Sequence, residues 1–248
     1  MLPKKARKKL LNKEIVFYKT LDILDEYKPE PAKKSIPEWY RNTENYMGNE
    51  KKPNGNAQTS ATIKKCMPVF DAITAGYIIT TYADIFVSRQ TIQINSGEII
   101  TSPWYEWPSI ESIQFHPIEQ APLHPANQNS PYPKFMNPWG IKTPKGYSIL
   151  FIPPMHRKTP FNILPGIVDT DTYVPPVNFP FVLSDPEFEG LIPAGTPVAQ
   201  LIPFKRESWL SSVSTKEIFN QIIDVNKKLS SHFFDKYKSF FWHRKDYK

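Results

Sequence analysis

The chain has 248 residues, with 26 prolines, 9 glycines, one cysteine and a formal charge of +7. A single cysteine excludes an intrachain disulfide framework, and 40% hydrophobic residues with six tryptophans exclude wholesale disorder. The sequence lacks the apolar run of about 18 residues that a membrane span needs, and no apolar leader follows Met1. We therefore expect neither a membrane span nor a signal peptide.

The positive charge is concentrated at the two ends of the chain. Residues 1–13 hold six Lys or Arg and no acid, and residues 225–248 carry a net +5, which leaves a body of −4. This pattern does not predict a nucleic-acid-reading face on the folded body. Basic ends are most often solvated; otherwise they contact nucleic acid, a membrane surface or an acidic partner.

Proline and charge together divide the chain into three predicted segments. These are an N-terminal arm over 1–60 with a basic start, a β domain over 61–210, and a C-terminal amphipathic helix over 211–248 with a basic end. Twenty prolines lie in 103–203, where they exclude long helices because each internal proline removes a hydrogen-bond donor.

The elements expected in the first half are short. Residues 14–18 can pair as a strand, and Pro37 opens a short helix anchored by Trp39 and Tyr40. Apolar runs predict four strands, followed by one further run at 99–100, with a hairpin connection at 88–90 and a second turn at 95–98. The four strands are expected over 67–70, 76–82, 84–88 and 91–94.

Residues 101–144 hold nine prolines and the tryptophans Trp104, Trp107 and Trp139, with little periodicity. We expect a large ordered insertion lying across the sheet. Strands then return over 146–152, 166–169, 178–183 and 198–202. Short strands at this spacing predict a mainly β fold: a barrel, clip or sandwich.

The tail has the pattern of a long helix. Ser214 and Glu217 have capping-box spacing, and apolar residues recur every three or four positions from Ile218 to Phe240. Such a helix can pack on its own β body, join subunits or dock on a partner, or lie on a membrane surface.

Several enzyme motifs are missing from the sequence. None of the five histidines has the His-x-Asp or His-x-Glu neighbour that begins the facial metal site of jelly-roll oxygenases. Cys66 lies between Lys65 and Met67, a context more typical of a core filler than of a nucleophile. Neither G-x-S-x-G nor a Gly-rich phosphate loop occurs, so no metal or cofactor is predicted from motifs.

Three motifs follow one another between residues 144 and 207: PKGY at 144–147, GIVDTDTY at 166–173 and GTPVAQLI at 195–202. The series resembles the β-clip core of the trimeric dUTPase and dCTP deaminase superfamily. Residues 75–79 weakly match that superfamily's first motif. The resemblance implies a β-clip fold, in a chain with a large Pro-rich insertion and a long C-terminal α-helix, and it favours a trimer.

The same resemblance implies roles for particular residues. In those enzymes an aspartate contacts the deoxyribose and positions water, the next aromatic stacks on the sugar, an Arg-Ser-Gly turn holds phosphates, and carboxylates hold Mg²⁺. Here Asp169 matches the aspartate, but Tyr173 lies one residue late and Arg157 lacks the Ser-Gly. Ile78 replaces a further carboxylate. The pattern supports inheritance of the fold more than of the reaction.

A second resemblance involves SIPEWY at 35–40, the segment 63–72 and PFKRESW at 203–209. These are similar to an uncharacterised protein family of marine T4-like phages and some bacteria. This implies a phage-encoded protein in the host cytoplasm or the virion.

Three functions remain open. The preferred one is a non-catalytic β-clip assembly or binding protein whose partners are further copies or other virion proteins, with nucleic acid contacted only through the basic ends. The second is a divergent, Mg²⁺-dependent nucleotide hydrolase using Asp169 and Asp171. The third is a glycan- or nucleotide-binding module using the tryptophan-rich insertion.

The residues singled out for these functions each have a structural alternative. Asp169 and Asp171 can cap a turn, and Arg206 with Glu207 can form a surface ion pair. The candidate set, with the tryptophans included, is Asp71, Trp104, Trp107, Trp139, Arg157, Asp169, Asp171, Tyr173, Gln200, Arg206 and Glu207.

Overall fold

The structure is a computed structural model that describes residues 13–22, 25–49, 61–107, 111–120, 123–126, 131–213, 216–230 and 237–248. Strands make up 35% and helices 21% of it, so the predicted mainly β architecture is confirmed. Among the described residues every strand pair is antiparallel. Within the same ranges, no helix is long and apolar enough to cross a membrane.

The described strands are β1 Val16–Lys19, β2 Glu30–Pro31, β3 Tyr77–Thr80, β4 Ile85–Gln93, β5 Ile99–Glu106, β6 Ile113–His116, β7 Tyr132–Phe135, β8 Trp139–Lys142, β9 Tyr147–Ile152, β10 Phe161–Ile163, β11 Gly166–Val168, β12 Phe179–Leu183, β13 Gly190–Ile192 and β14 Pro197–Lys205. The helices are α1 Glu38–Asn42, α3 Met67–Thr74 and α4 Lys216–Ser230, with a π-helical turn η6 at Tyr237–Phe241. Short 3-10 turns are η1 Asp25–Tyr27, η2 Ala32–Ser35, η3 Met47–Asn49, η4 Ile63–Lys65 and η5 Ile118–Gln120.

The strands of the described residues form four sheets, with the orders β1-β8, β10-β12-β7-β6, β11-β9-β14-β3-β2 and β13-β4-β5. β14 is the central strand of the largest sheet, pairing with β3 on one side and β9 on the other. Gly76 precedes β3 with φ +66°, and a Cβ there would lie 1.8 Å from the Leu201 carbonyl oxygen. Only glycine therefore allows β3 to approach β14 this closely.

One aromatic-rich core joins these sheets. Phe181 packs edge-on to Tyr105, with ring centroids 5.5 Å apart, and lies 5.1 Å from the Phe161 ring. Burial of such side chains is the main favourable contribution to folding. Other buried members include Phe135, Trp139, Ile141, Ile149, Phe151, Phe179, Ile192 and Leu201.

Many predicted elements are confirmed. The expected strand over 14–18 forms β1, Pro37 directly precedes α1, and the turn at 95–98 joins β4 to β5 with Gly97 at φ +84°. The strands expected in the second half correspond to β9, β11, β12 and β14.

Two local predictions in the first half are wrong. Residues 67–70 begin the helix α3, because Pro68 lies in its first turn, where a missing N–H costs nothing. Residues 88–90 lie inside β4 and pair with 102–104 of β5 instead of forming a turn. Their polar side chains are partly or fully exposed, which a strand at this position of the sheet tolerates.

Among the described residues of 101–144, a separate insertion is not found. These residues form most of β5 and all of β6, β7 and β8, which pair with β4, β12 and β1. The aromatics of this stretch fill the common core: Tyr105, Phe135 and Trp139 are all buried. Prolines are tolerated in part because β5 is an edge strand.

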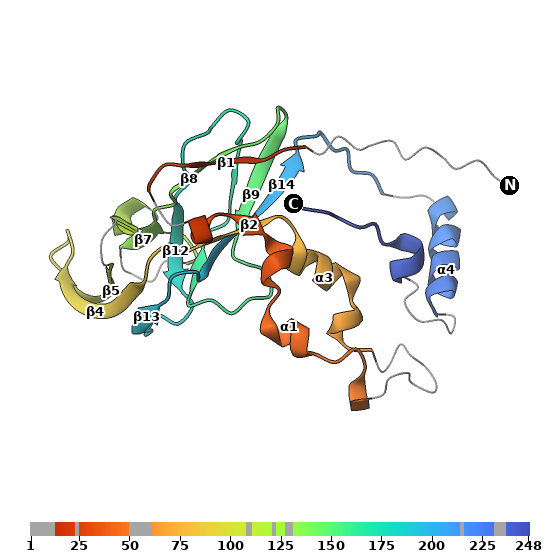
Figure 1. Cartoon of the computed structure of the whole chain (residues 1–248), viewed down its shortest axis with the longest axis horizontal. Coiled ribbons are helices and arrows are strands. Elements are labelled where there is room, and N and C mark those ends of the chain that lie inside the picture. The colour runs from red at the N-terminus through yellow and green to blue at the C-terminus, as the bar shows by residue number, and fades with distance from the viewer. Residues whose placement is uncertain are drawn as a thin grey trace.

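The predicted long C-terminal helix is shorter than expected. α4 is described only over Lys216–Ser230, while residues 242–248 are not helical and run back towards the β body (Figure 1). The sequence after α4 is rich in aromatic residues of lower helix propensity, and its last residues gain contacts with the body. Ser214 of the expected capping box lies outside the described residues. We call residues 207–248 the C-terminal arm.

Candidate functional site

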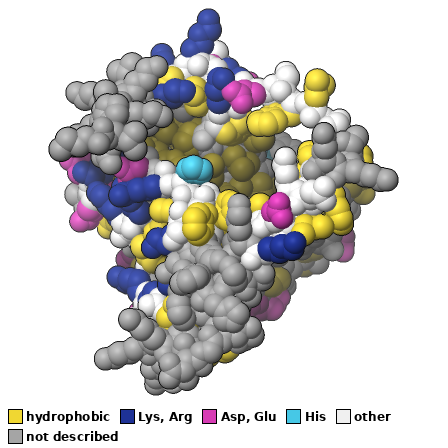
Figure 2. Space-filling view, turned by 90° about the vertical axis from the view of Figure 1, so that its right-hand side faces the viewer, with side chains coloured by type: hydrophobic (Ala, Val, Ile, Leu, Met, Phe, Trp, Pro, Cys, Tyr) yellow, Lys and Arg dark blue, Asp and Glu magenta, His cyan; other side chains and the backbone are white. Residues whose placement is uncertain are grey.

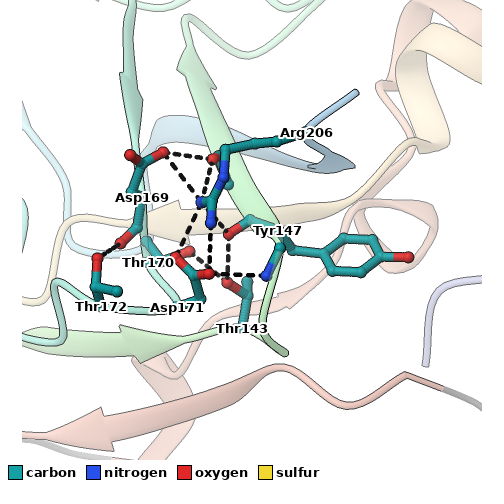
Figure 3. A network of polar contacts seen from close by, with 9 residues as sticks. Thr143, Tyr147, Asp169, Thr170, Asp171, Thr172 and Arg206 are labelled. Atoms are coloured by element: carbon teal, nitrogen blue, oxygen red, sulfur yellow. Dashed lines mark hydrogen bonds and ion pairs between the residues drawn. The ribbon is translucent and has the colours of Figure 1, made fainter. Parts of the chain in front are cut away.

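A network of polar contacts surrounds the turn that follows β11 (Figure 3). The Arg206 guanidinium binds both oxygens of Asp171: Nη1 donates to Oδ1 at 2.9 Å and Nη2 to Oδ2 at 2.5 Å. Nη1 also lies 3.2 Å from Asp169 Oδ1, which accepts a hydrogen bond of 2.6 Å from the Ser148 hydroxyl. Two-point binding of this kind fixes both partners in direction as well as distance.

This network holds the turn before β9 in place. The Gly146 amide donates to Asp171 Oδ2 at 2.8 Å, and Arg206 Nη1 donates to the Tyr147 carbonyl oxygen at 3.1 Å. Thr143 donates its hydroxyl hydrogen to the same carbonyl at 3.0 Å. The backbone of Tyr147 is thus fixed, while its ring points away from the network (Figure 3).

The two aspartates have different environments. The Asp171 side chain is 4% exposed, and its hydrogen bonds from Arg206 and from the Gly146 amide lower its pKa to about 2. The same pairing raises the pKa of Arg206 above its ordinary value. Asp169 has a side chain that is 61% exposed.

The two aspartates do not fit a Mg²⁺ site. Both carboxylates face the Arg206 guanidinium, whose positive charge would repel a divalent cation. Asp171 already accepts hydrogen bonds at both oxygens. In the part of the chain that the structure describes, no three His, Cys, Asp or Glu side chains are grouped as a metal would need.

A groove of about 780 Å³ lies beside this network. Its lining includes Thr143, Pro144 and Tyr147 together with the last residues of the chain. On the face that carries the C-terminal arm, hydrophobic side chains gather in a hollow with Lys, Arg, Asp and Glu around it (Figure 2). The aromatic and cationic side chains lining the groove are Lys13, Tyr77, Tyr147, Arg244, Tyr247 and Lys248.

Asp71 of α3 anchors the end of the C-terminal arm. The Trp242 indole N–H lies 3.0 Å from both Asp71 carboxylate oxygens, and Lys245 Nζ is 2.6 Å from one of them. The Tyr77 hydroxyl donates to the Lys248 carbonyl at 3.1 Å. Asp71 was a candidate for chemistry, and the structure gives it an attachment role.

Arg157 is committed to the backbone. Its guanidinium donates to the carbonyl oxygens of Ala32, Ser35 and Ile73, at 2.9 to 3.4 Å, and so ties η2 and α3 to the loop after β9. Burial lowers the pKa of Arg157. The side chain predicted to meet phosphates therefore has its donors directed into the protein.

Gln200 is also engaged internally. Its side chain is buried, donates to the Ala72 and Ala75 carbonyls at 2.9 and 2.8 Å, and accepts from the Met155 amide at 2.8 Å. Tyr173 is exposed, with its amide donating to the Asp169 carbonyl at 2.9 Å. Glu207 pairs with Lys205, not with Arg206 as predicted.

The three tryptophans of the expected stacking surface are separated by burial. Trp139 is 6% exposed and lies in the core, and Trp107 is half-buried against it. Trp104 stacks on Phe115 with centroids 5.8 Å apart and an interplanar angle of 14°. A shared exposed platform of three rings is not formed.

Sequence reasoning missed the groove residues Lys13, Tyr77, Tyr147 and Arg244 as a group. Tyr147 was noted only as part of the PKGY motif, and the cations only as parts of basic ends. The signal present in the sequence was that both ends of the chain are basic.

No model of a known protein family matches the chain. A search of curated proteins likewise finds no relative with significant sequence similarity.

Proposed function

We propose that this chain is a non-catalytic assembly protein that associates with further copies of itself through α4. The observation that carries the proposal is the exposed apolar face of that helix. Phe219 is 62% and Ile222 is 52% exposed, and Ile218 and Ile223 are exposed beside them. Contiguous apolar surface of this kind marks interaction sites, because leaving it in water is unfavourable.

The spacing on α4 favours a second copy as the partner. Apolar residues recur along α4 at alternating steps of four and three, which is the spacing of the contact residues, or seam, of paired helices. These residues are Ile218, Ile222, Val225 and Leu229. A further copy of the chain supplies the same seam. Charge also favours self-association, because basic ends on one copy can approach the body of −4 on another.

The geometry around Asp169 supports a non-catalytic role. Asp171 and Arg206 neutralise one another and fix a turn, and Arg157 and Gln200 are used within the fold. We keep the β-clip as the proposed fold on the motifs at 144–207, and with it a trimer as the expected assembly. The resemblance to a phage family supports a virion or accessory protein.

Sedimentation and light scattering of the intact chain over a concentration series test the assembly. The double variant Ile218→Asp, Ile222→Asp places two charges on the apolar face and should convert the oligomer to a monomer. Asn220→Asp adds a charge to the opposite face of α4 and is the matched control. It should leave the assembly intact.

Three results would contradict the proposal. A wild-type chain that stays monomeric at every concentration excludes assembly through α4, and an oligomer that survives the double variant places the interface elsewhere. Mg²⁺-dependent pyrophosphate release from a deoxynucleoside triphosphate, abolished by Asp169→Asn, would overturn the non-catalytic part.

A further inference from the structure

The two basic ends of the chain meet on the same groove. Lys13 is the last of the six N-terminal cations, and Arg244 and Lys248 belong to the C-terminal basic segment, yet all three line the groove of about 780 Å³. The sequence pattern suggested separate solvated ends. Their convergence places three cations against the two acids Glu14 and Asp246 in the groove lining, a small positive excess on a body that is otherwise slightly acidic.

Two acids, Glu14 and Asp246, line this groove, and Asp246 is paired with lysine side chains. Asp246 lies 2.7 Å from Lys33 Nζ and 3.9 Å from Lys248 Nζ, and Asp71 is 2.6 Å from Lys245 Nζ. Among the described residues, no carboxylate oxygen lies within 4 Å of the charged nitrogens of Lys13 or Arg244. These two cations are therefore available to an anionic ligand.

Aromatic rings line the groove together with the cations. Tyr77 and Tyr247 pack edge-to-face with centroids 6.1 Å apart, and Tyr147 lines the same groove. Lys13 Nζ lies 4.1 Å from the centroid of the Tyr147 ring. The Tyr147 backbone is held by Arg206 and Thr143, so this ring projects from a fixed support.

We infer that this groove binds single-stranded nucleic acid. Lys13 and Arg244 contact phosphates, and a base stacks on Tyr147 when Lys13 moves from the ring to a phosphate. Alternating cations and aromatic rings are the features by which proteins hold single strands without reading sequence. A duplex keeps its base faces stacked inside and cannot use the rings. The inference is independent of assembly through α4, since every residue involved lies on one copy.

Fluorescence anisotropy with labelled oligo-dT and oligo-U of about a dozen nucleotides tests the inference on the full chain. We expect saturable binding of both strands, with affinity falling steeply between about 50 and 200 mM salt. A duplex of the same length, a mononucleotide and poly-glutamate serve as competitors. Only unlabelled single strands should displace the probe at comparable concentration.

Variants distinguish the phosphate contacts of the cations from the stacking of a base on Tyr147. Lys13→Gln and Arg244→Gln should each lower the slope of log affinity against log salt by about 0.7. Tyr147→Leu should weaken binding by about 5- to 100-fold and leave that slope unchanged, because a base–ring stack carries no charge. Tyr147→Phe keeps the ring and should bind as wild type. Lys134→Gln, on β7, removes a charge away from the groove and should have no effect.

Each other result overturns the inference. Absence of binding to either strand removes it, as does binding that the Lys13, Arg244 and Tyr147 variants leave unchanged. Displacement by poly-glutamate at the same charge concentration shows a merely cationic surface, and displacement by the mononucleotide at the same phosphate concentration shows a nucleotide site instead. Light scattering of each variant confirms that its oligomeric state matches wild type.

Discussion

The β body and the C-terminal arm contain the same apolar residue types but differ in how far they bury them. In the body, Phe181 is buried among other aromatic rings. In the arm, Phe219 of α4 and Phe240 of η6 are exposed. The body therefore completes its core without these arm residues, which leaves them to make contacts outside the single chain.

The largest expected effect comes from making the same substitution in each region. Phe181→Ala should lower the free energy of unfolding by about 3–5 kcal/mol, because it leaves a cavity in the core. Phe219→Ala should change it by less than about 0.5 kcal/mol in dilute, monomeric protein, because its side chain is exposed. Urea unfolding measures both. An equal decrease in the free energy of unfolding for the two variants would show that α4 packs on the body.

A smaller effect should appear at Asp171 and should depend on pH. Its pKa of about 2 in the folded chain lies below the ordinary value of 3.8, so the stability it contributes is present above about pH 4. That contribution is lost as pH falls towards 2 and the carboxylate becomes protonated. The difference in stability between wild type and Asp171→Asn should therefore shrink over this range.

The matched control for that pH series is Asp22→Asn, whose side chain is fully exposed in the wild type. The difference in stability between Asp22→Asn and wild type should stay small and constant from pH 5 to pH 2. A difference at Asp171 that is equally flat would contradict the role given to the Arg206 pair.

The smallest effect on global stability is expected at Asp71. Asp71→Asn weakens the contacts to Trp242 and Lys245 and should free the end of the arm while the body stays folded. Loss of about 1–2 kcal/mol of local stabilisation corresponds to about 5- to 30-fold faster tryptic cleavage after Arg244 or Lys245. Asp224→Asn on α4 should cleave at the wild-type rate, and an unchanged rate for Asp71→Asn would show that Asp71 does not anchor the arm.

The sequence was most informative where local pattern decides structure. β9, β11, β12 and β14 follow from short apolar runs between Pro and Gly turns, and α1 follows from Pro37. The helix α3 was missed because Val69 and Phe70 favour strands in isolation, whereas Pro68 in a first turn favours a helix. Such short apolar segments do not distinguish the two by periodicity.

The candidate site depended on contacts that no local pattern contains. Asp171 was singled out from the sequence as a candidate residue, but only the structure shows Arg206 as its partner. Gln200 is buried because two carbonyls and an amide from distant segments satisfy it. Lys13 and Arg244 come from opposite ends of the chain and share the groove only through tertiary folding.

The central position of β14 has a mechanical consequence for an assembly held by α4. The arm leaves the body directly after Lys205, the last residue of this strand, and β14 is hydrogen-bonded to β3 and β9 on its two sides. Tension from a neighbouring copy would enter along the strand axis and load both ladders in shear, so that many hydrogen bonds resist at once. Arg206 directly follows the strand and is bound to Asp171 by two hydrogen bonds. This ion pair would therefore bear the force before the strand does.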